Sequence, residues 1–242
     1  MKIVIAPDSF KGSLTAAEAA EAIETGFRAV YPDAEYVKVP MADGGEGTVQ
    51  SLVDATSGTI ITQLVSGPMG DMVAGFFGIL GDRQTAVIEM AAASGIHWVR
   101  PKERDVYLAS SFGTGQLINA ALDRGCDKLI VGLGGSATND GGMGMMKALG
   151  AQFLDQEGVQ LTADVRALLQ LERIDLRHLD PRLDKTEIVV ACDVDNPLCG
   201  ENGAARVFGP QKGATEEDIA VLDQALTRYG DILSANAGRD IA

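Results

Sequence analysis

Four short apolar runs constrain the fold of this chain more than any other feature. None of them alternates polar with apolar residues, so each is expected to be a strand buried on both faces, as in a parallel sheet covered by helices. The runs span residues 2–6, 85–90, 128–132 and 187–192. Helical stretches lie between them, and strands that alternate with helices predict an α/β fold with parallel sheets.

The segments between the runs are of two kinds. Residues 15–30 are rich in Ala and Glu, and Thr15 with Glu18 has the pattern of a capping box at their start. Residues 58–81 instead carry β-branched stretches broken by Gly and Pro, which predicts antiparallel hairpins. Further helices are expected at residues 115–123, 144–149 and 215–226.

Composition and charge exclude several classes of partner. The chain has 242 residues, of which 20 are Lys or Arg and 34 are Asp or Glu, and its net charge is −14. Nucleic acids and anionic membranes bind clustered positive charge, so neither is expected as a partner. The 3 cysteines form no C-x-x-C pair, which fits reduced thiols. Because no signal peptide or apolar run of membrane-spanning length is present, we expect a cytoplasmic protein.

Polar side chains follow the first run, at the sheet edge where open α/β folds bind ligands. The stretch DSFKGS brings Asp8, Ser9 and Lys11 to a helix N-terminus, where free N–H groups and the helix dipole favour an anion. It is not a Walker A motif, and a surface lysine in an ordinary turn is the alternative. In MADGGEGT, Asp43 and Glu46 can ligate Mg²⁺ or orient a hydroxylic substrate, or they cap a helix.

The third run leads into a glycine loop, residues 132–142, with the sequence GLGGSATNDGG. Glycines let backbone N–H groups converge on an oxyanion. Asp140 can serve a metal or a substrate hydroxyl, or it caps the helix that begins near Gly142. The candidate ligand-binding residues of the loop are Gly134, Gly135, Ser136, Thr138 and Asn139.

The same loop permits a second interpretation. Gly132, Gly134 and Ala137 satisfy G-x-G-x-x-[GA] after a strand, and Asp155 ends the next apolar run, close to where an NAD site places its ribose-binding acid. In the dinucleotide fingerprint, however, the loop flows straight into its helix, whereas T-N-D-G-G intervenes here. An NAD-dependent oxidoreductase is therefore the alternative, and it requires Asp155 to lie beside the glycine loop.

The most acidic strand end follows the fourth run. Asp193 and Asp195 alternate along the chain, so only one can point into a shared site unless the chain turns, which Pro197 favours. Asn196 lies beside them, and a solvated acidic turn is the alternative. Farther on, FGPQKGAT (208–215) repeats the Lys-Gly arrangement before a helix, which makes Lys212 a second candidate anion clamp.

These motifs together resemble the bacterial glycerate kinase family, of the type that yields 2-phosphoglycerate. The resemblance spans nearly the whole chain, in order, and rests on APDSFKGSLTA (6–16), MADGGEGT (41–48), AVIEMAAASG (86–95), SSFGTG (110–115), GLGGSATNDGGMGMMKALG (132–150), ACDVDNPL (191–198) and GPQKGA (209–214). It implies phosphorylation of D-glycerate with ATP and Mg²⁺.

The resemblance also implies a domain organisation. Two α/β domains are expected, one Rossmann-like and one flavodoxin-like, with the site between them. Residues 1–65 are then the first part of a discontinuous domain, and residues 66–242 are the second domain. Family members continue through another glycine-rich segment and a further acidic motif, so the C-terminal part of the fold is expected after residue 242.

Phosphoryl transfer sets the roles that the candidate residues can take. It needs positioning, a metal, positive charge on the moving phosphoryl group and a base near the attacking hydroxyl. Lys11 and Lys212 can neutralise phosphate or clamp the glycerate carboxylate. Asp193 and Asp140 are candidates for the base, and Asp195 is the candidate metal ligand, although the sequence does not separate base from ligand. A non-catalytic ligand-binding fragment is a further alternative, and a homo-oligomer is compatible with the sequence.

Overall fold

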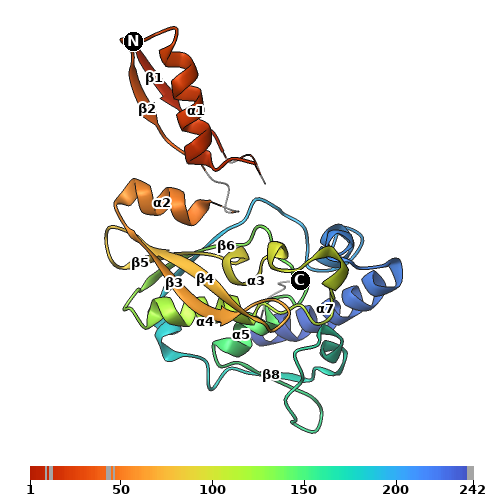
Figure 1. Cartoon of the computed structure of the whole chain (residues 1–242). Coiled ribbons are helices and arrows are strands. Elements are labelled where there is room, and N and C mark those ends of the chain that lie inside the picture. The colour runs from red at the N-terminus through yellow and green to blue at the C-terminus, as the bar shows by residue number, and fades with distance from the viewer. Residues whose placement is uncertain (9, 11–12, 42–44, 46, 239–242) are drawn as a thin grey trace.

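The computed structural model describes residues 1–8, 10, 13–41, 45 and 47–238. An N-terminal unit stands beside the larger body of the molecule (Figure 1) and contains β1 (Lys2–Ile5), α1 (Ala16–Arg28) and β2 (Glu35–Lys38). β1 and β2 pair in parallel. The capping box predicted at Thr15 is confirmed, because the Glu18 N–H donates to Thr15 Oγ1 while Glu18 Oε2 accepts from the Thr15 N–H.

A five-stranded sheet forms the centre of the larger body. Its strand order is β3-β4-β5-β6-β9, with β3 (Thr59–Ser66), β4 (Met72–Ile79), β5 (Thr85–Glu89), β6 (Lys128–Gly132) and β9 (Glu187–Ala191). β5, β6 and β9 pair in parallel, as the apolar runs predict. β3 and β4 form the antiparallel hairpin expected within residues 58–81. The α/β class is confirmed, and its main sheet is mixed.

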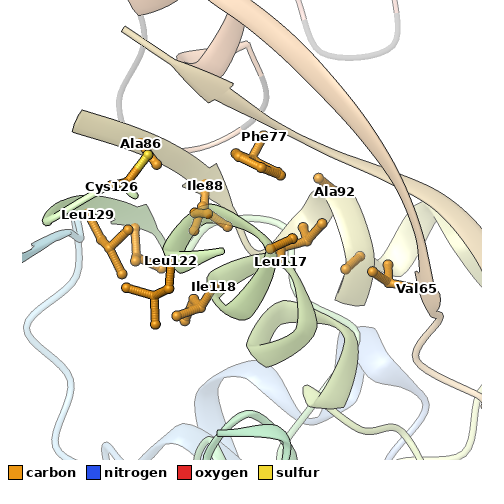
Figure 2. Close-up of a cluster of buried hydrophobic side chains, with 14 of the residues drawn as sticks. Val65, Phe77, Ala86, Ile88, Ala92, Leu117, Ile118, Leu122, Cys126 and Leu129 are labelled. Atoms are coloured by element: carbon orange, nitrogen blue, oxygen red, sulfur yellow. The ribbon is translucent and has the colours of Figure 1, made fainter. Parts of the chain in front are cut away.

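Helices cover both faces of β5, because its side chains alternate between two cores. On one face, Ala86 and Ile88 pack with Leu117 of α4 (Phe112–Leu122) in the cluster of Figure 2. On the other face, Val87 packs with Val49 of α2 (Thr48–Thr56). All five residues of β5 are buried, so this strand has the double burial predicted for it.

The prediction that a strand is buried on both faces is wrong for β9 and for β1. Ile188, Val189 and Val190 of β9 are 49%, 40% and 53% exposed, and Val4 of β1 is 59% exposed. β9 is the edge strand of the main sheet, beyond the helices that pack on β4 and β5, and β1 belongs to a separate two-stranded sheet. Apolar sequence alone marks these runs as strands, but only covering helices would bury them.

A second core lies beneath the glycine loop. The long helix α7 (Glu216–Ala237) packs Leu222, Leu226 and Tyr229 there, with Phe153 among their neighbours. The sequence predicts that this helix ends at residue 226, whereas it continues for eleven more residues because Tyr229 extends its buried stripe. The remaining elements around this core are α5 (Met143–Ala148), β7 (Gln152–Leu154), η3 (Val165–Gln170), β8 (Arg173–Asp175) and α6 (Ala204–Phe208).

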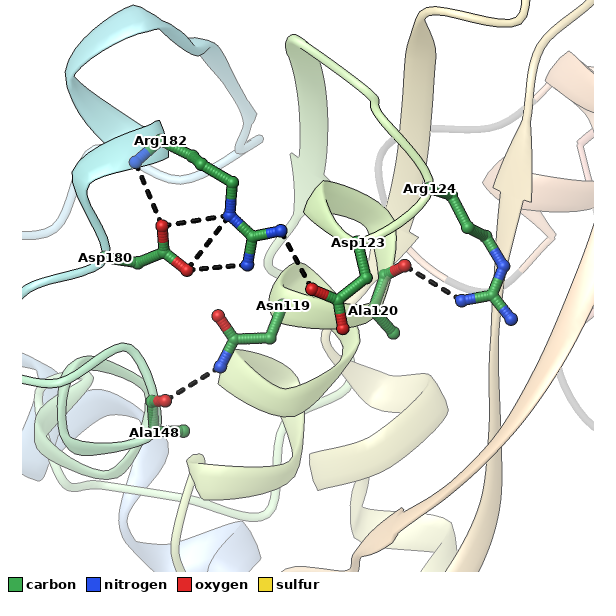
Figure 3. Close-up of polar contacts among 7 residues, drawn as sticks. All are labelled: Asn119, Ala120, Asp123, Arg124, Ala148, Asp180 and Arg182. Carbon is green, nitrogen blue, oxygen red and sulfur yellow. Dashed lines mark hydrogen bonds and ion pairs between the residues drawn. The ribbon is translucent and has the colours of Figure 1, made fainter.

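Polar contacts join the two cores along α4 (Figure 3). Asn119 Nδ2 donates to the Ala148 carbonyl at the end of α5, at 2.8 Å. Arg182 of η4 (Pro181–Lys185) binds Asp180 through Nη2 at 2.7 Å and Asp123 through Nη1 at 2.8 Å. These contacts fix α4 against the segments that precede β7 and β9.

The sequence analysis places a domain boundary at residue 65, which lies inside β3 in the structure, and α2 already packs on β4 and β5. We therefore propose that the two units divide between β2 and α2. Among the described helices, none is both long and apolar enough to cross a membrane.

Candidate functional site

A cavity of about 470 Å³ opens at the carboxyl ends of β5, β6 and β9. We call it the sheet-edge cavity. Part of its wall is apolar, and the rest presents backbone of the glycine loop and three titratable side chains. It is lined by Gly45, Phe76, Glu89, Ala91, Ala92, Ile96, His97, Gly134, Gly135 and Asp193. This is the sheet edge at which open α/β folds bind ligands, and the sequence predicts a site there.

The glycine loop forms one wall because it lies along the segment that follows β5. The Ile96 N–H donates to the Gly135 carbonyl at 2.9 Å, and the Ala137 N–H donates to the Ser94 carbonyl at 2.9 Å. Gly135 has φ +73°, and a Cβ at this position would lie 3.3 Å from the Ala91 Cβ. Both observations favour glycine where the loop meets α3 (Ala91–Ser94).

Asp193 is the carboxylate that the loop after β9 contributes to the cavity. Its side chain is exposed, as is that of Asp195, which does not line the cavity. Asn196 Nδ2 donates to the Asn202 carbonyl at 3.0 Å and so shapes its own loop. The structure therefore brings one of these three candidates to the cavity wall.

Asp140 occupies a buried position behind the glycine loop. Its Oδ2 accepts from the Ser111 N–H at 2.9 Å, from Ser111 Oγ at 2.7 Å and from the Gly144 N–H at 3.0 Å. Its Oδ1 accepts from the Gly142 N–H at 3.1 Å. The side chain is 1% exposed and is not among the residues that line the cavity. The sequence leaves Asp140 either a role toward a metal or substrate hydroxyl or a role as a helix cap, and these contacts match the helix cap. They also connect α5 to the start of α4.

Lys212, which the sequence suggests as an anion clamp, is also buried. It lies in η5 (Pro210–Lys212), is 6% exposed, and donates from Nζ to Ser136 Oγ at 2.9 Å and to the Thr138 carbonyl at 2.5 Å. Burial lowers the pKa of Lys212 to about 8, and the negative charge of Asp140 partly opposes this shift. The ammonium group thus contacts the glycine loop itself.

Thr138 and Asn139 are buried in the loop as well. The side-chain Nδ2 of Asn139 is buried and has no hydrogen-bond partner among the residues that the structure describes. A buried donor without a partner is uncommon in folded proteins and marks a place where a ligand oxygen would be favoured.

The candidates from the N-terminal motifs are only partly within the described residues. Ser9, Lys11, Asp43 and Glu46 lie outside them. Asp8 is exposed and does not line the cavity. Gly45, however, lies in the cavity wall, so the MADGGEGT motif reaches the same site as the glycine loop and Asp193.

Two titratable residues of the cavity were not among the sequence candidates. Glu89 ends β5, is 4% exposed, and accepts from the Val49 N–H at 2.7 Å, at the first turn of α2. Its place at the end of an apolar run was the signal that could have identified it. The other is His97, whose ring lies at a tilt beside that of Trp98, with centroids 4.9 Å apart, and lines the cavity.

The topology rules out the dinucleotide interpretation of the glycine loop. The strand that Asp155 follows, β7, pairs antiparallel with β8 in a separate sheet, whereas the neighbours of β6 are β5 and β9. Asp155 instead accepts from the Glu157 and Val159 N–H groups and closes a turn. An NAD site needs its acid at the end of the adjacent parallel strand, so this alternative is wrong.

Comparison with known proteins assigns the family. The sequence profile of the glycerate kinase family matches residues 3–242. The chain belongs to the glycerate kinase family. It is 58% identical over 241 residues to a glycerate kinase of Haemophilus influenzae, with 100% of this chain and 64% of that protein covered. It is 54% identical over 233 residues to the glycerate 2-kinase of Escherichia coli, with 96% and 61% covered.

A solved structure shows the same fold. The chain superimposes on a crystal structure described as putative glycerate kinase 2 from Salmonella typhimurium with a TM-score of 0.91 and 54% identity, covering 100% of this chain and 64% of that one. The chain thus spans a little under two thirds of the length of these relatives. Within the described residues, no three His, Cys, Asp or Glu side chains are arranged to hold a metal ion.

Proposed function

We propose that the protein containing this chain transfers the γ-phosphoryl group of ATP to D-glycerate and forms 2-phosphoglycerate. One observation carries the proposal: the sheet-edge cavity combines glycine-loop backbone, Asp193 and Gly45 at the carboxyl ends of three parallel strands. Family membership supports the same chemistry, and the relative from Escherichia coli is named a glycerate 2-kinase.

Asp193 is the group we assign to the substrate hydroxyl. For that hydroxyl oxygen to bond to the γ-phosphorus while the bond to the ADP oxygen breaks, its proton must pass to a base. Among the described residues, Asp193 and Glu89 are the carboxylates that line the cavity, and Glu89 is buried and already accepts from the Val49 N–H. Asp193 is exposed at the cavity wall, which leaves it the better placed acceptor.

The glycine loop is assigned to the phosphoryl group. The loop presents Gly134 and Gly135 to the cavity, whereas Asn139 of the same loop is buried and does not line it. Backbone N–H donors of such a loop stabilise the charge that the transferring phosphoryl group spreads over its oxygens. Lys11 keeps the role proposed from its motif, that of neutralising phosphate or holding the glycerate carboxylate.

The residues present also fit Mg²⁺. This ion is usually held by one or two carboxylates together with substrate phosphates, rather than by a cage of protein ligands. Asp193 or Asp195 would hold it, and it would neutralise charge on the phosphate oxygens. Asp140 is assigned the helix cap instead of a catalytic role, because four hydrogen bonds already engage its carboxylate.

The test is an assay of D-glycerate-dependent ADP release by the full-length protein. We expect Asp193→Asn to lower kcat/KM by at least ~10²-fold, in the range for loss of a general base. Asp33→Asn, at an exposed aspartate of the N-terminal unit, is the matched control and should have little effect. ³¹P NMR of the product distinguishes 2- from 3-phosphoglycerate. Wild-type protein without glycerate-dependent activity would refute the proposal.

A further inference from the structure

The buried amine of Lys212 contacts the glycine loop and does not face the cavity. Its two hydrogen bonds go to Ser136 Oγ and to the Thr138 carbonyl, 76 and 74 residues earlier in the chain. An ammonium group has three N–H donors, so two are committed to the glycine loop. The side chain is 6% exposed and is not part of the cavity wall.

The loop is therefore held at neighbouring points by different elements. The segment after β5 binds it through the Gly135 carbonyl and the Ala137 N–H. Lys212 binds the loop at Ser136 and Thr138, the residues on either side of Ala137. The two preceding residues, Gly134 and Gly135, line the cavity.

We propose that Lys212 is a positioning residue, which fixes the glycine loop from its buried side and does not itself bind the phosphate or the glycerate carboxylate. This inference rests on the proposed function for its kinetic consequence, but the contact it describes exists without any ligand. The direct anion clamp suggested by the sequence would need the ammonium group to face the cavity.

The hydrogen bonds of Lys212 matter because its ammonium group is buried. Burial of an ammonium group is costly, and the hydroxyl and the carbonyl that accept from Lys212 offset part of that cost, while its pKa remains lowered to about 8. The carboxylate of Asp140 supplies compensating charge from the far end of the same loop. If Lys212 is replaced by Met, the Thr138 carbonyl loses its Lys212 partner while the apolar stem is roughly preserved. The loop then has fewer constraints on the conformation that presents Gly134 and Gly135.

Hydrogen exchange of the full-length protein without ligand tests the contact directly. The reporters are the Ala137 and Ile96 N–H groups, which donate to the Ser94 and Gly135 carbonyls and so join the glycine loop to the segment after β5. We expect Lys212→Met to raise their exchange rates by at least ~10-fold, since loss of a buried charged hydrogen bond costs about as much as a tenfold change in an equilibrium. Lys147→Met is the matched control, because Lys147 Nζ donates to the Leu161 and Thr162 carbonyls, outside the glycine loop.

Kinetics then separate positioning from direct binding. For a positioning residue, Lys212→Met lowers kcat for glycerate phosphorylation at least ~10-fold with a smaller change in the KM for ATP, because the transition-state donors are misplaced while most nucleotide contacts remain. Unchanged exchange at Ala137 and Ile96, with ATP binding lost, would overturn the proposal in favour of a direct clamp. If Lys212→Met does not fold, Ser136→Ala removes one of the two bonds and should raise the same exchange rates less.

The two proposals fail in different ways. A wild-type protein that shows no glycerate-dependent ADP release refutes the proposed function, whereas the exchange measurement still decides the role of Lys212. Wild-type activity together with a Lys212→Met variant of unchanged exchange and unchanged kcat refutes the positioning role alone.

Discussion

Replacing Asp140 by Asn tests whether this carboxylate is a buried structural group. Asp140 Oδ2 accepts three hydrogen bonds and Oδ1 accepts one. Asn has a single side-chain oxygen. If that oxygen takes the place of Oδ2, the amide group of Asn faces the Gly142 N–H, so two donors meet and one bond is lost. The three remaining bonds lose the negative charge that strengthened them.

The magnitude follows from these contacts. A hydrogen bond to a charged group contributes about 1.5–3 kcal/mol, and a buried donor left without its acceptor adds a penalty of similar size. We therefore expect Asp140→Asn to lower the free energy of unfolding by about 2–3 kcal/mol. For a protein of this size that corresponds to a Tm lower by roughly 4–12 °C.

Urea denaturation of the full-length protein, followed by circular dichroism, is the assay. Asp33→Asn serves as control, because this exposed aspartate should change stability by no more than about 0.5 kcal/mol. An Asp140→Asn midpoint equal to that of the wild type would refute the reasoning. Asp140 would then be free to act on a ligand, and its hydrogen bonds would carry no net stability.

Three further predictions concern the walls of the site. Gly135→Ala should lower the free energy of unfolding by about 1 kcal/mol or more in urea, because Gly135 has φ +73° and the added Cβ would lie 3.3 Å from the Ala91 Cβ. Glu89→Gln should lower it by about 1 kcal/mol, since the negative charge at the first turn of α2 is lost while the acceptor for Val49 remains; an unchanged midpoint would contradict this. Between pH 8 and 10.5 the wild type should gain stability relative to Lys212→Met, because the unfolded chain there binds the Lys212 proton more tightly than the folded chain; a flat difference would show that Lys212 is not buried as an ammonium group.

The strands of the fold were predictable because their signal is local. Runs 2–6, 85–90, 128–132 and 187–192 each contain the observed strand to within one or two residues at either end. The hairpin of β3 and β4 was predictable for the same reason, since Gly and Pro interrupt its β-branched stretches. Burial of β9 was not predictable, because it depends on what packs against the sheet edge, which no single run encodes.

The cavity was predictable in location, but the surroundings of each side chain were less so. The rule that ligands bind where parallel strands end led us to expect the glycine loop and Asp193 close together, and Gly134, Gly135 and Asp193 do line one cavity. It could not distinguish a carboxylate that faces the cavity, such as Asp193, from one turned into the protein, such as Asp140. That difference arises from Ser111, which is distant in sequence and meets Asp140 only after folding.

Lys212 and His97 also show that local sequence does not determine whether a side chain reaches the cavity. The Lys-Gly pattern before a helix suggests a cation that binds an anion, yet Lys212 is buried against the glycine loop. His97 has no polar motif around it, yet it lines the cavity because the glycine loop lies along the segment that carries it. In each case long-range packing determines the environment of the side chain, and local sequence does not.

A crystal structure of the full-length protein with D-glycerate and a non-hydrolysable ATP analogue tests the central claim most directly. That claim is that the sheet-edge cavity is where the phosphoryl group and the attacking hydroxyl meet. We predict that the γ-phosphate analogue lies against the backbone of Gly134 and Gly135, with a glycerate hydroxyl within hydrogen-bond distance of Asp193. Ligands bound elsewhere, with this cavity containing only solvent, would contradict the account.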